Sequence, residues 1–291
     1  MEYTLFLGCI APLRYPGIER SAWAVMRRLG VKIHQIEGFS CCPAPGLFKP
    51  LNEKTWLVLG ARNLSLASER GYGIMTVCNG CQTTLSEVSR ILKADQELKE
   101  EINEFLSSIG RRYDKDVTVR HCIDLLYDDV GVARIKKTVK NSLTGLRVAI
   151  HYGCHYLLEA KETGKNFKKL EVAERLVEAT GADVIEYTEN MTCCGAGEGI
   201  KSGAPGVALD VASQKIKSIA QARVDCIVVI CSFCLLQLDR SQVQIENFSR
   251  KFQIPVLHYL QLLHLALDSV PAAMLGFKSH SIPPEKILSR T

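Results

Sequence analysis

Cys193-Cys194-Gly195 is the stretch around which this chain is organised, because further cysteines stand on both sides of it. Thirty-eight residues separate Cys154 from Cys193, and 36 separate Cys194 from the segment Cys231-Ser232-Phe233-Cys234. Ligand sets made of thiolates alone suit zinc or iron–sulfur clusters. Five of them in one segment indicate a metal site.

An earlier part of the chain repeats this arrangement, with 31 residues between Cys9 and Cys41-Cys42 and 35 between Cys42 and Cys78-Asn79-Gly80-Cys81. We define the first thiol set as Cys9, Cys41, Cys42, Cys78 and Cys81, and the second thiol set as Cys154, Cys193, Cys194, Cys231 and Cys234. The two sets use ten of the 12 cysteines. The other two, Cys122 and Cys226, lie in apolar stretches and are interpreted as small buried side chains.

Residues other than cysteine repeat as well. The pair Gly8-Cys9 matches Gly153-Cys154, and an alanine stands two residues after each adjacent cysteine pair. Lys49 and Lys201 each lie seven residues beyond the second cysteine of their pair. A match at several fixed positions predicts the duplication of one structural unit.

Length and composition suit two domains. At 291 residues the chain is predicted to form a first domain over 1–135, a polar and basic linker over 136–145, and a second domain over 146–291. The formal charge of +5 indicates no nucleic-acid partner, and no apolar run is long enough to span a bilayer. The N-terminus lacks the basic region of a signal peptide, so we expect a cytoplasmic protein, where clustered cysteines bind metals more often than they form disulfides.

Short apolar runs alternate with helical patterns throughout the chain. We expect strands at 4–7, 31–36, 73–77, 117–120, 147–152, 182–187, 226–230 and 255–257. Helices are expected at 18–29, 52–70, 81–93, 95–109, 170–180 and 206–223, with shorter ones ending at Leu125 and Leu267. This order predicts an α/β fold of two similar Rossmann-like domains in tandem with mainly parallel sheets. The thiols follow the carboxyl ends of strands, where such sheets form their sites.

The number of thiols limits what they bind. Structural zinc takes four ligands and so does an ordinary cubane iron–sulfur cluster, whereas each set here offers five. The surplus requires a cluster of unusual geometry, a bridging thiolate, or one cysteine in each set that is not a ligand. Structural zinc, disulfides and ten reduced core cysteines are the less favoured interpretations of the same pattern.

The two thiol sets resemble the duplicated cysteine-rich CCG domain, and the chain resembles the B subunits of heterodisulfide reductases from methanogens. The resemblance covers nearly the whole chain. It departs from the pattern at Pro43, which stands in the first copy where the second copy has Gly195. This departure leaves every thiol in place.

The resemblance implies that each set holds one non-cubane [4Fe-4S] cluster and that the substrate disulfide, formed from coenzyme M and coenzyme B, lies between them. It also implies a complex with the flavin-containing and the ferredoxin-like subunits of heterodisulfide reductase. That complex would join a hydrogenase or formate dehydrogenase and perform flavin-based electron bifurcation. The chain lacks the C-x-x-C-x-x-C-x-x-x-C-P run of ferredoxins, so it needs an external electron donor.

Five further residues follow from their positions. Lys49 and Lys201 are candidates for binding the anionic groups of such a substrate, and solvated loop lysines are the alternative. His155 directly follows Cys154 and is a candidate proton donor to a leaving thiolate. His121 and His258 occupy matching positions at the start of helices and are interpreted as structural or capping residues.

Two other functions remain open from the sequence. A CCG protein of a thiol:fumarate, quinone or hydroxyacid oxidoreductase would use similar cysteines for a different acceptor. A zinc-binding assembly scaffold would use them without catalysis.

Overall fold

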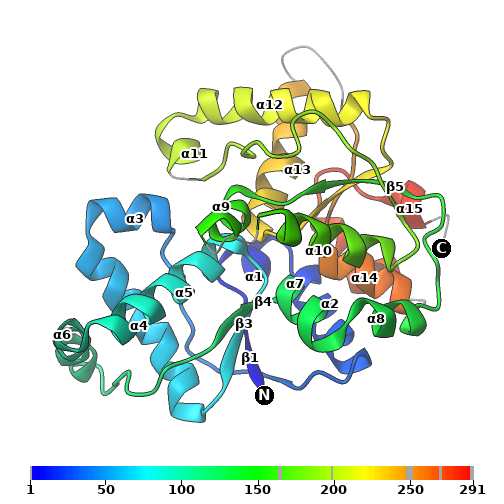
Figure 1. Cartoon of the computed structure of the whole chain (residues 1–291). Helices are drawn as coiled ribbons and strands as arrows, with labels where there is room; N and C mark the ends of the chain where they lie inside the picture. Colours follow the sequence, from blue (N-terminus) through cyan, green and yellow to red (C-terminus); the bar gives the residue numbers. More distant parts are fainter. Residues whose placement is uncertain (1, 163–165, 198, 247–251, 269–270, 289–291) are drawn as a thin grey trace.

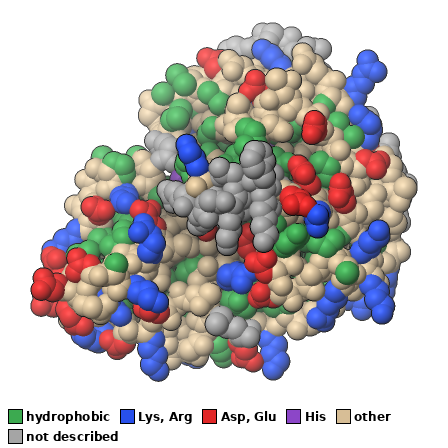
Figure 2. Space-filling model, in the orientation of Figure 1, with side chains coloured by type: hydrophobic (Ala, Val, Ile, Leu, Met, Phe, Trp, Pro, Cys, Tyr) green, Lys and Arg blue, Asp and Glu red, His purple; other side chains and the backbone are tan. Residues whose placement is uncertain are grey.

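The computed structural model describes residues 2–162, 166–197, 199–246, 252–268 and 271–288. The first half of the chain occupies the lower part of the view in Figure 1, and the second half lies above it. Figure 2 shows the same face with acidic and basic side chains interspersed over it. Among the described helices, none has both the length and the apolar composition needed to cross a membrane.

Each half alternates strands with helices. The first half comprises β1 (Tyr3–Phe6), α1 (Ile10–Arg14), α2 (Gly17–Arg28), β2 (Ile33–His34), α3 (Pro45–Leu51), α4 (Glu53–Arg70), β3 (Gly73–Thr76), α5 (Asn79–Ala94), α6 (Gln96–Ser107), β4 (Val119–His121), α7 (Cys122–Leu125), a π-helical turn (Leu126–Val130) and α8 (Val132–Thr138).

The second half repeats this order and adds a C-terminal segment. It comprises β5 (Arg147–His151), α9 (Cys154–Glu162), α10 (Asn166–Glu178), β6 (Asp183–Val184), α11 (Ile200–Gly203), α12 (Pro205–Gln221), β7 (Cys226–Val229), α13 (Ser232–Glu246), β8 (Val256–His258), α14 (Tyr259–Leu267), two 3-10 turns (Ala272–Leu275 and Phe277–Ser279) and α15 (Glu285–Leu288).

Within the described residues the strands form two four-stranded sheets with matching order, β2-β1-β3-β4 and β6-β5-β7-β8. Every registered strand pair is parallel. The predicted α/β class, the parallel sheets and the duplication are confirmed. In each sheet the strand order reverses beside the first strand of the half, and ligand sites of open α/β sheets form at that point, beyond the carboxyl ends of the strands.

Local sequence explains where the longest helix of the first half begins and ends. The side chain of Asn52 accepts a hydrogen bond of 2.8 Å from the backbone N–H of Thr55, which satisfies one of the free donors at the start of α4. Gly71 ends the helix in the left-handed conformation, with φ of 69°. The predicted capping roles are confirmed for His121, which accepts from the backbone N–H of Ile123, and for His258.

Each half contributes a helix that packs on helices of the other half. α14 of the second half packs on α2 of the first, and α10 packs on α7 and α8 (Figure 1). The side chains of both halves join one continuous buried core. His258 adds a polar link, because its Nε2 lies 3.0 Å from the backbone oxygen of Val77. This reciprocal packing holds the carboxyl ends of the two sheets against each other.

The segment proposed as a linker also belongs to the packed structure. Its first residues continue α8, which ends at Thr138. The backbone N–H groups of Lys140 and Asn141 then donate hydrogen bonds of 3.0 Å to the oxygen of Ala266 in α14. The division at 136–145 stays a proposal about the sequence units, and the residues within it are fixed to the second half.

Candidate metal centre

Both thiol sets are placed by the same local design. Cys9 follows β1 and Cys154 follows β5, the first strand of each half. Cys78 follows β3 and Cys231 follows β7, which lie beside those strands in the sheets. The adjacent cysteine pairs arrive on the long loops after β2 and β6. The repeated topology therefore brings each set together at the carboxyl edge of its own sheet.

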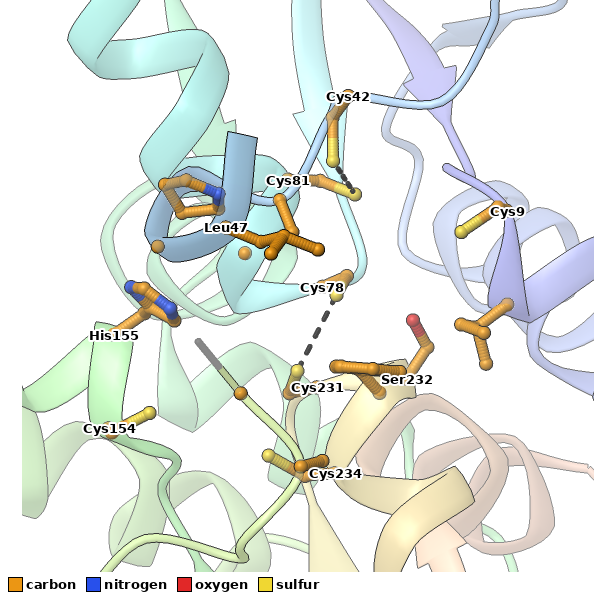
Figure 3. A pocket seen from close by; sticks show the side chains of 18 of the residues that line it. Cys9, Cys42, Leu47, Cys78, Cys81, Cys154, His155, Cys231, Ser232 and Cys234 are labelled. Atoms are coloured by element: carbon orange, nitrogen blue, oxygen red, sulfur yellow. Dashed lines mark hydrogen bonds between the residues drawn. The ribbon is translucent and has the colours of Figure 1, made fainter. Parts of the chain in front are cut away.

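The two sets face one cavity of about 150 Å³ between the halves. Its lining includes nine of the ten predicted cysteines; Cys193 is the exception. In Figure 3, Cys42 and Cys81 project from the first half, Cys154 and Cys234 from the second. Other lining residues include Leu47, Ser232 and Phe233, and the described lining outside the sulfurs is mostly apolar.

Short sulfur–sulfur distances occur within the sets and between them. Cys42 Sγ lies 3.1 Å from Cys81 Sγ, and Cys194 Sγ lies 3.5 Å from Cys234 Sγ. Cys78 Sγ and Cys231 Sγ, which belong to different sets, are 3.5 Å apart (Figure 3). The two sets therefore meet at Cys78 and Cys231, across the boundary between the halves.

The sulfur of Cys193, which does not line the cavity, has a backbone hydrogen-bond donor instead. It accepts a hydrogen bond of 3.3 Å from the backbone N–H of Gly195. Gly195 has φ of 88°, and a Cβ there would lie 2.5 Å from the backbone oxygen of Ala208. Glycine is therefore required for this turn, which aims a backbone donor at a thiol of the second set.

The thiols perturb one another's ionisation. Hydrogen bonding with Cys41 and burial raise the pKa of Cys9, and hydrogen bonding with Cys193 and burial raise the pKa of Cys154. Hydrogen bonds with neighbouring thiols, that of Cys41 above all, lower the pKa of Cys42. Without a bound metal, only some of these thiols can therefore ionise, because several thiolates in one desolvated space repel one another. A bound metal removes that repulsion and releases the thiol protons.

The residues present fit an iron–sulfur cluster in each half. The donors are soft sulfurs gathered at one buried edge, and the glycine before the first cysteine of each set leaves room beside them. A Cβ at Gly8 would lie 2.7 Å from Cys81 Sγ, and a Cβ at Gly153 would lie 3.5 Å from Cys234 Sγ. Both glycines have positive φ. Backbone without a side chain is what a bulky inorganic group next to these thiols requires.

The three other candidates lie in different places. Lys49 does not line the cavity; its Nζ lies 2.5 Å from Glu87 Oε1. Lys201 donates a hydrogen bond of 2.6 Å to the side-chain oxygen of Gln237 and also lies outside the lining. His155 lines the cavity. It also lines a second cavity of about 560 Å³ between α5 and α9.

Cys122 and Cys226 do not line the cavity. Both are fully buried in the continuous core, at the start of α7 and of β7. Burial raises the pKa of Cys122, as expected for a thiol in apolar surroundings. Their interpretation as small buried side chains is confirmed.

Two buried residues beside the second thiol set escaped the sequence analysis. A ring nitrogen of His151 and the sulfurs of Cys194 and Cys234 all lie within 4.8 Å of one another. Lys215 is also buried, and its Nζ donates to the backbone oxygen of Glu189. The signal that could have revealed them is the departure from the repeat, because these two positions differ in kind from their counterparts in the first half.

Comparison with known proteins agrees with this architecture. The CCG family model, described as a cysteine-rich domain, matches residues 3–86 and 148–239. A solved structure of a hypothetical protein from Helicobacter pylori superposes with a TM-score of 0.73 at 14% identity, covering 97% of this chain and 52% of that one. At that identity the likeness shows the fold alone.

Several curated relatives extend over the whole chain. The B subunit of the ferredoxin/F(420)H(2)-dependent CoB-CoM heterodisulfide reductase of Methanosarcina acetivorans is 43% identical, covering 99% of this chain and 96% of the relative. The B subunit of the ferredoxin:CoB-CoM heterodisulfide reductase of Methanosarcina mazei is 41% identical over the same shares. The 8-methylmenaquinol:fumarate reductase membrane anchor subunit of Wolinella succinogenes is 32% identical, covering 98% of this chain and 99% of that relative.

The donor chemistry, the family model and these relatives make the chain an iron–sulfur protein. Matches at this identity and coverage go beyond a shared fold. The chain belongs to the family of heterodisulfide reductase B subunits, which carry the cysteine-rich CCG domain twice.

Proposed function

We propose that this chain is the disulfide-reducing subunit of a heterodisulfide reductase complex and that its substrate is the mixed disulfide of coenzyme M and coenzyme B. The observation that carries the proposal is the contact between the two thiol sets, with 3.5 Å between Cys78 Sγ and Cys231 Sγ. A disulfide has two sulfur atoms, and a site with one redox group on each side can address both.

The reaction requires two electrons and two protons. The sulfur–sulfur bond breaks, each sulfur gains one electron, and each thiolate takes one proton to become a thiol. We propose that the five sulfurs of the first thiol set hold one non-cubane [4Fe-4S] cluster and those of the second set hold another. Such clusters, when bound, supply single electrons. The protein supplies the cavity, whose apolar lining excludes water from the bond that breaks.

His155 is the proposed proton donor, because it lines both the sulfur cavity and the second cavity. The second cavity has no cysteine in its described lining, which includes Arg90, Glu87 and Glu159. Arg90 provides a cation that suits a sulfonate, carboxylate or phosphate. Lys49, paired with Glu87, and Lys201 stay proposals for anion binding.

Electrons must come from outside the chain, because the described residues form no ferredoxin-type site. We propose the ferredoxin-like subunit of the complex as the immediate donor and the flavin-containing subunit beyond it, with a hydrogenase or formate dehydrogenase in the larger complex. The names of the relatives as B subunits support a multisubunit assembly. We also propose that the complex acts in the cytoplasm.

Metal analysis of anaerobically prepared protein tests the cofactor assignment. Two clusters of four irons require eight irons and a similar amount of acid-labile sulfide per chain. The double variant Cys193→Ala/Cys194→Ala is expected to lose the cluster of the second half and to keep about half of the iron. The matched control is Cys122→Ala, which removes a buried thiol outside both sets and should keep all of it. One or two zinc ions per chain, without iron, would instead favour an assembly scaffold.

Turnover with a reduced viologen dye as electron donor tests the substrate. We expect the mixed disulfide to be reduced faster than the homodisulfide of either coenzyme, with two thiols formed per disulfide. The relative from Wolinella gives a specific reason to test a second function, that of a CCG protein in a fumarate, quinone or hydroxyacid oxidoreductase. Reaction of the iron-loaded protein with a menaquinol, without any disulfide reduction, would favour that function.

A further inference from the structure

The two halves differ at a position that adjoins the thiols. With Gly8-Cys9 aligned on Gly153-Cys154, the last residue of β1, Phe6, corresponds to the last residue of β5, His151. The strand registers agree, since Phe6 pairs with Thr76 on β3 and His151 pairs with Val229 on β7. An apolar ring in the first half is thus an imidazole in the second.

His151 is fully buried, and neither of its ring nitrogens has a hydrogen-bond partner among the described residues. A ring nitrogen, Cys194 Sγ and Cys234 Sγ lie within 4.8 Å of one another. In either tautomer the imidazole carries at least one N–H. A buried N–H without a partner costs stability, so its place beside two thiols points to an acceptor there.

A second difference lies one helix away. With Cys42 aligned on Cys194, Lys215 of α12 corresponds to Asn63 of α4. Asn63 Nδ2 donates a hydrogen bond of 3.2 Å to the backbone oxygen of Cys41, which ties down the loop of the first set. Lys215 ties down the corresponding loop of the second set through Glu189, and it brings a charge that asparagine lacks.

The surroundings of Lys215 favour the protonated form of its side chain. Its Nζ lies 5.2 Å from the centre of the Tyr187 ring, over the face that attracts cations. Burial lowers the pKa of Lys215 to about 8, which leaves the ammonium form dominant at neutral pH. Thiolates of the second set are among the groups that favour this form. The second set thus has a nearby cation and a free N–H where the first has an amide and an apolar ring.

We infer that His151 and Lys215 make the two clusters unequal: once a cluster is bound, His151 donates a hydrogen bond to a sulfur at the second thiol set, Lys215 supplies a positive charge beside it, and the cluster of the second half therefore has the higher midpoint potential. The inference rests on the proposed function in one respect, the presence of a cluster in each half. Reduction adds negative charge to a cluster, and hydrogen bonds and cations near its sulfurs stabilise that charge. Electrons entering the protein would therefore occupy the second half first.

An EPR-monitored redox titration of the iron-loaded protein tests this directly. We expect two midpoint potentials in the unmodified chain. His151→Phe, which installs the residue of the first half, should lower the higher potential by at least a tenfold change in the reduction equilibrium, about 59 mV for one electron. His151→Gln keeps an N–H donor and should therefore lower this midpoint potential by less than His151→Phe does. The lower potential should stay unchanged in both variants.

A separate variant tests the charge of Lys215, and a second buried histidine provides the control for His151→Phe. Lys215→Gln should lower the same potential, because it keeps a donor for Glu189 but removes the cation. His264→Phe is the control, since His264 is buried, lies 3.3 Å from Ser21 Oγ and does not line the cavity. It should leave both potentials unchanged.

Pulsed EPR on the unmodified protein labelled with ¹⁵N-histidine gives a readout that does not depend on the folding of a variant. A weak ¹⁵N coupling is the expected result. The same measurement on the variants should retain the coupling in His264→Phe and lose it in His151→Phe. A strong coupling, as from a histidine bound directly to iron, would overturn the hydrogen-bond assignment, and so would the absence of any coupling. Equal potentials that His151→Phe leaves unchanged would overturn the inference while the cluster assignment stands. Protein without iron would overturn both.

Discussion

Replacing Cys231 with alanine is expected to lower the rate of heterodisulfide reduction by more than about a hundredfold. Changes in residues that merely support metal ligands cost about 10- to 100-fold, and Cys231 is itself a proposed ligand. Its sulfur is buried, lines the cavity and lies 3.5 Å from Cys78 Sγ of the other set. The substitution therefore removes a donor at the point where the two sets meet. Initial rates with reduced viologen, normalised to iron content, measure the effect.

The matched control for this variant is Cys226→Ala. Cys226 begins β7, the strand that delivers Cys231, and it is equally buried but does not line the cavity. Its loss should leave the rate within a factor of about two, although a small cavity in the core costs on the order of 1 kcal/mol of stability. A Cys231→Ala protein that reduces the mixed disulfide as fast per iron as Cys226→Ala does would contradict the proposed site.

The second large effect is expected from Gly153→Ala. Gly153 has φ of 81°, and a Cβ on it would lie 2.4 Å from Asn79 Nδ2. That amide cannot simply move away, because it donates a hydrogen bond of 2.8 Å to the backbone oxygen of Tyr152 in the other half. The added methyl group should therefore separate the halves beside Cys154. We expect a loss of about 3 kcal/mol in the free energy of unfolding, from backbone strain together with overpacking.

Gly145→Ala separates these two causes. Gly145 has φ of 80°, nearly the same as Gly153, but a Cβ there would meet no atom within 4 Å. Its substitution should cost only the strain of the left-handed conformation, about 1–2 kcal/mol. Chemical denaturation of both variants under anaerobic conditions gives the comparison. Equal losses in the two variants would show that the contact with Asn79 carries no energy.

The sequence predicted those features that depend on local pattern. The ends of α4 follow from Asn52 and Gly71, and the strands appear close to where the apolar runs indicate. Short helices such as α3 have too few residues for a periodic signal. α13 was missed although its counterpart α5 was predicted, because the polar and apolar residues after Cys231 are not separated onto opposite faces of a helix. The repeat itself would have supplied it.

The site was predictable as a list of thiols and not as an arrangement. Nothing in the spacing indicates that Cys193 lies outside the cavity lining, or that Lys49 pairs with Glu87. These facts arise from contacts between segments that are distant in the chain. The environment of the second set was missed for a different reason. His151 and Lys215 break the repeat, and a search for what the halves share passes over the positions where they differ.

The packing of helices of one half on the other half has a consequence for how the duplicated chain arose. A single copy excised from this chain would lose the packing of α2 against α14, a helix whose residues from Tyr259 to Leu267 are all buried. Each large apolar side chain returned to water costs about 1.5–3 kcal/mol, which is a sizeable share of the stability of an ordinary domain. A single unit of this kind would therefore gain stability by pairing with a second copy of itself. Fusion of two copies in one chain makes their ratio and pairing permanent, and it lets the copies differ, with a phenyl ring in the first where the second has an imidazole.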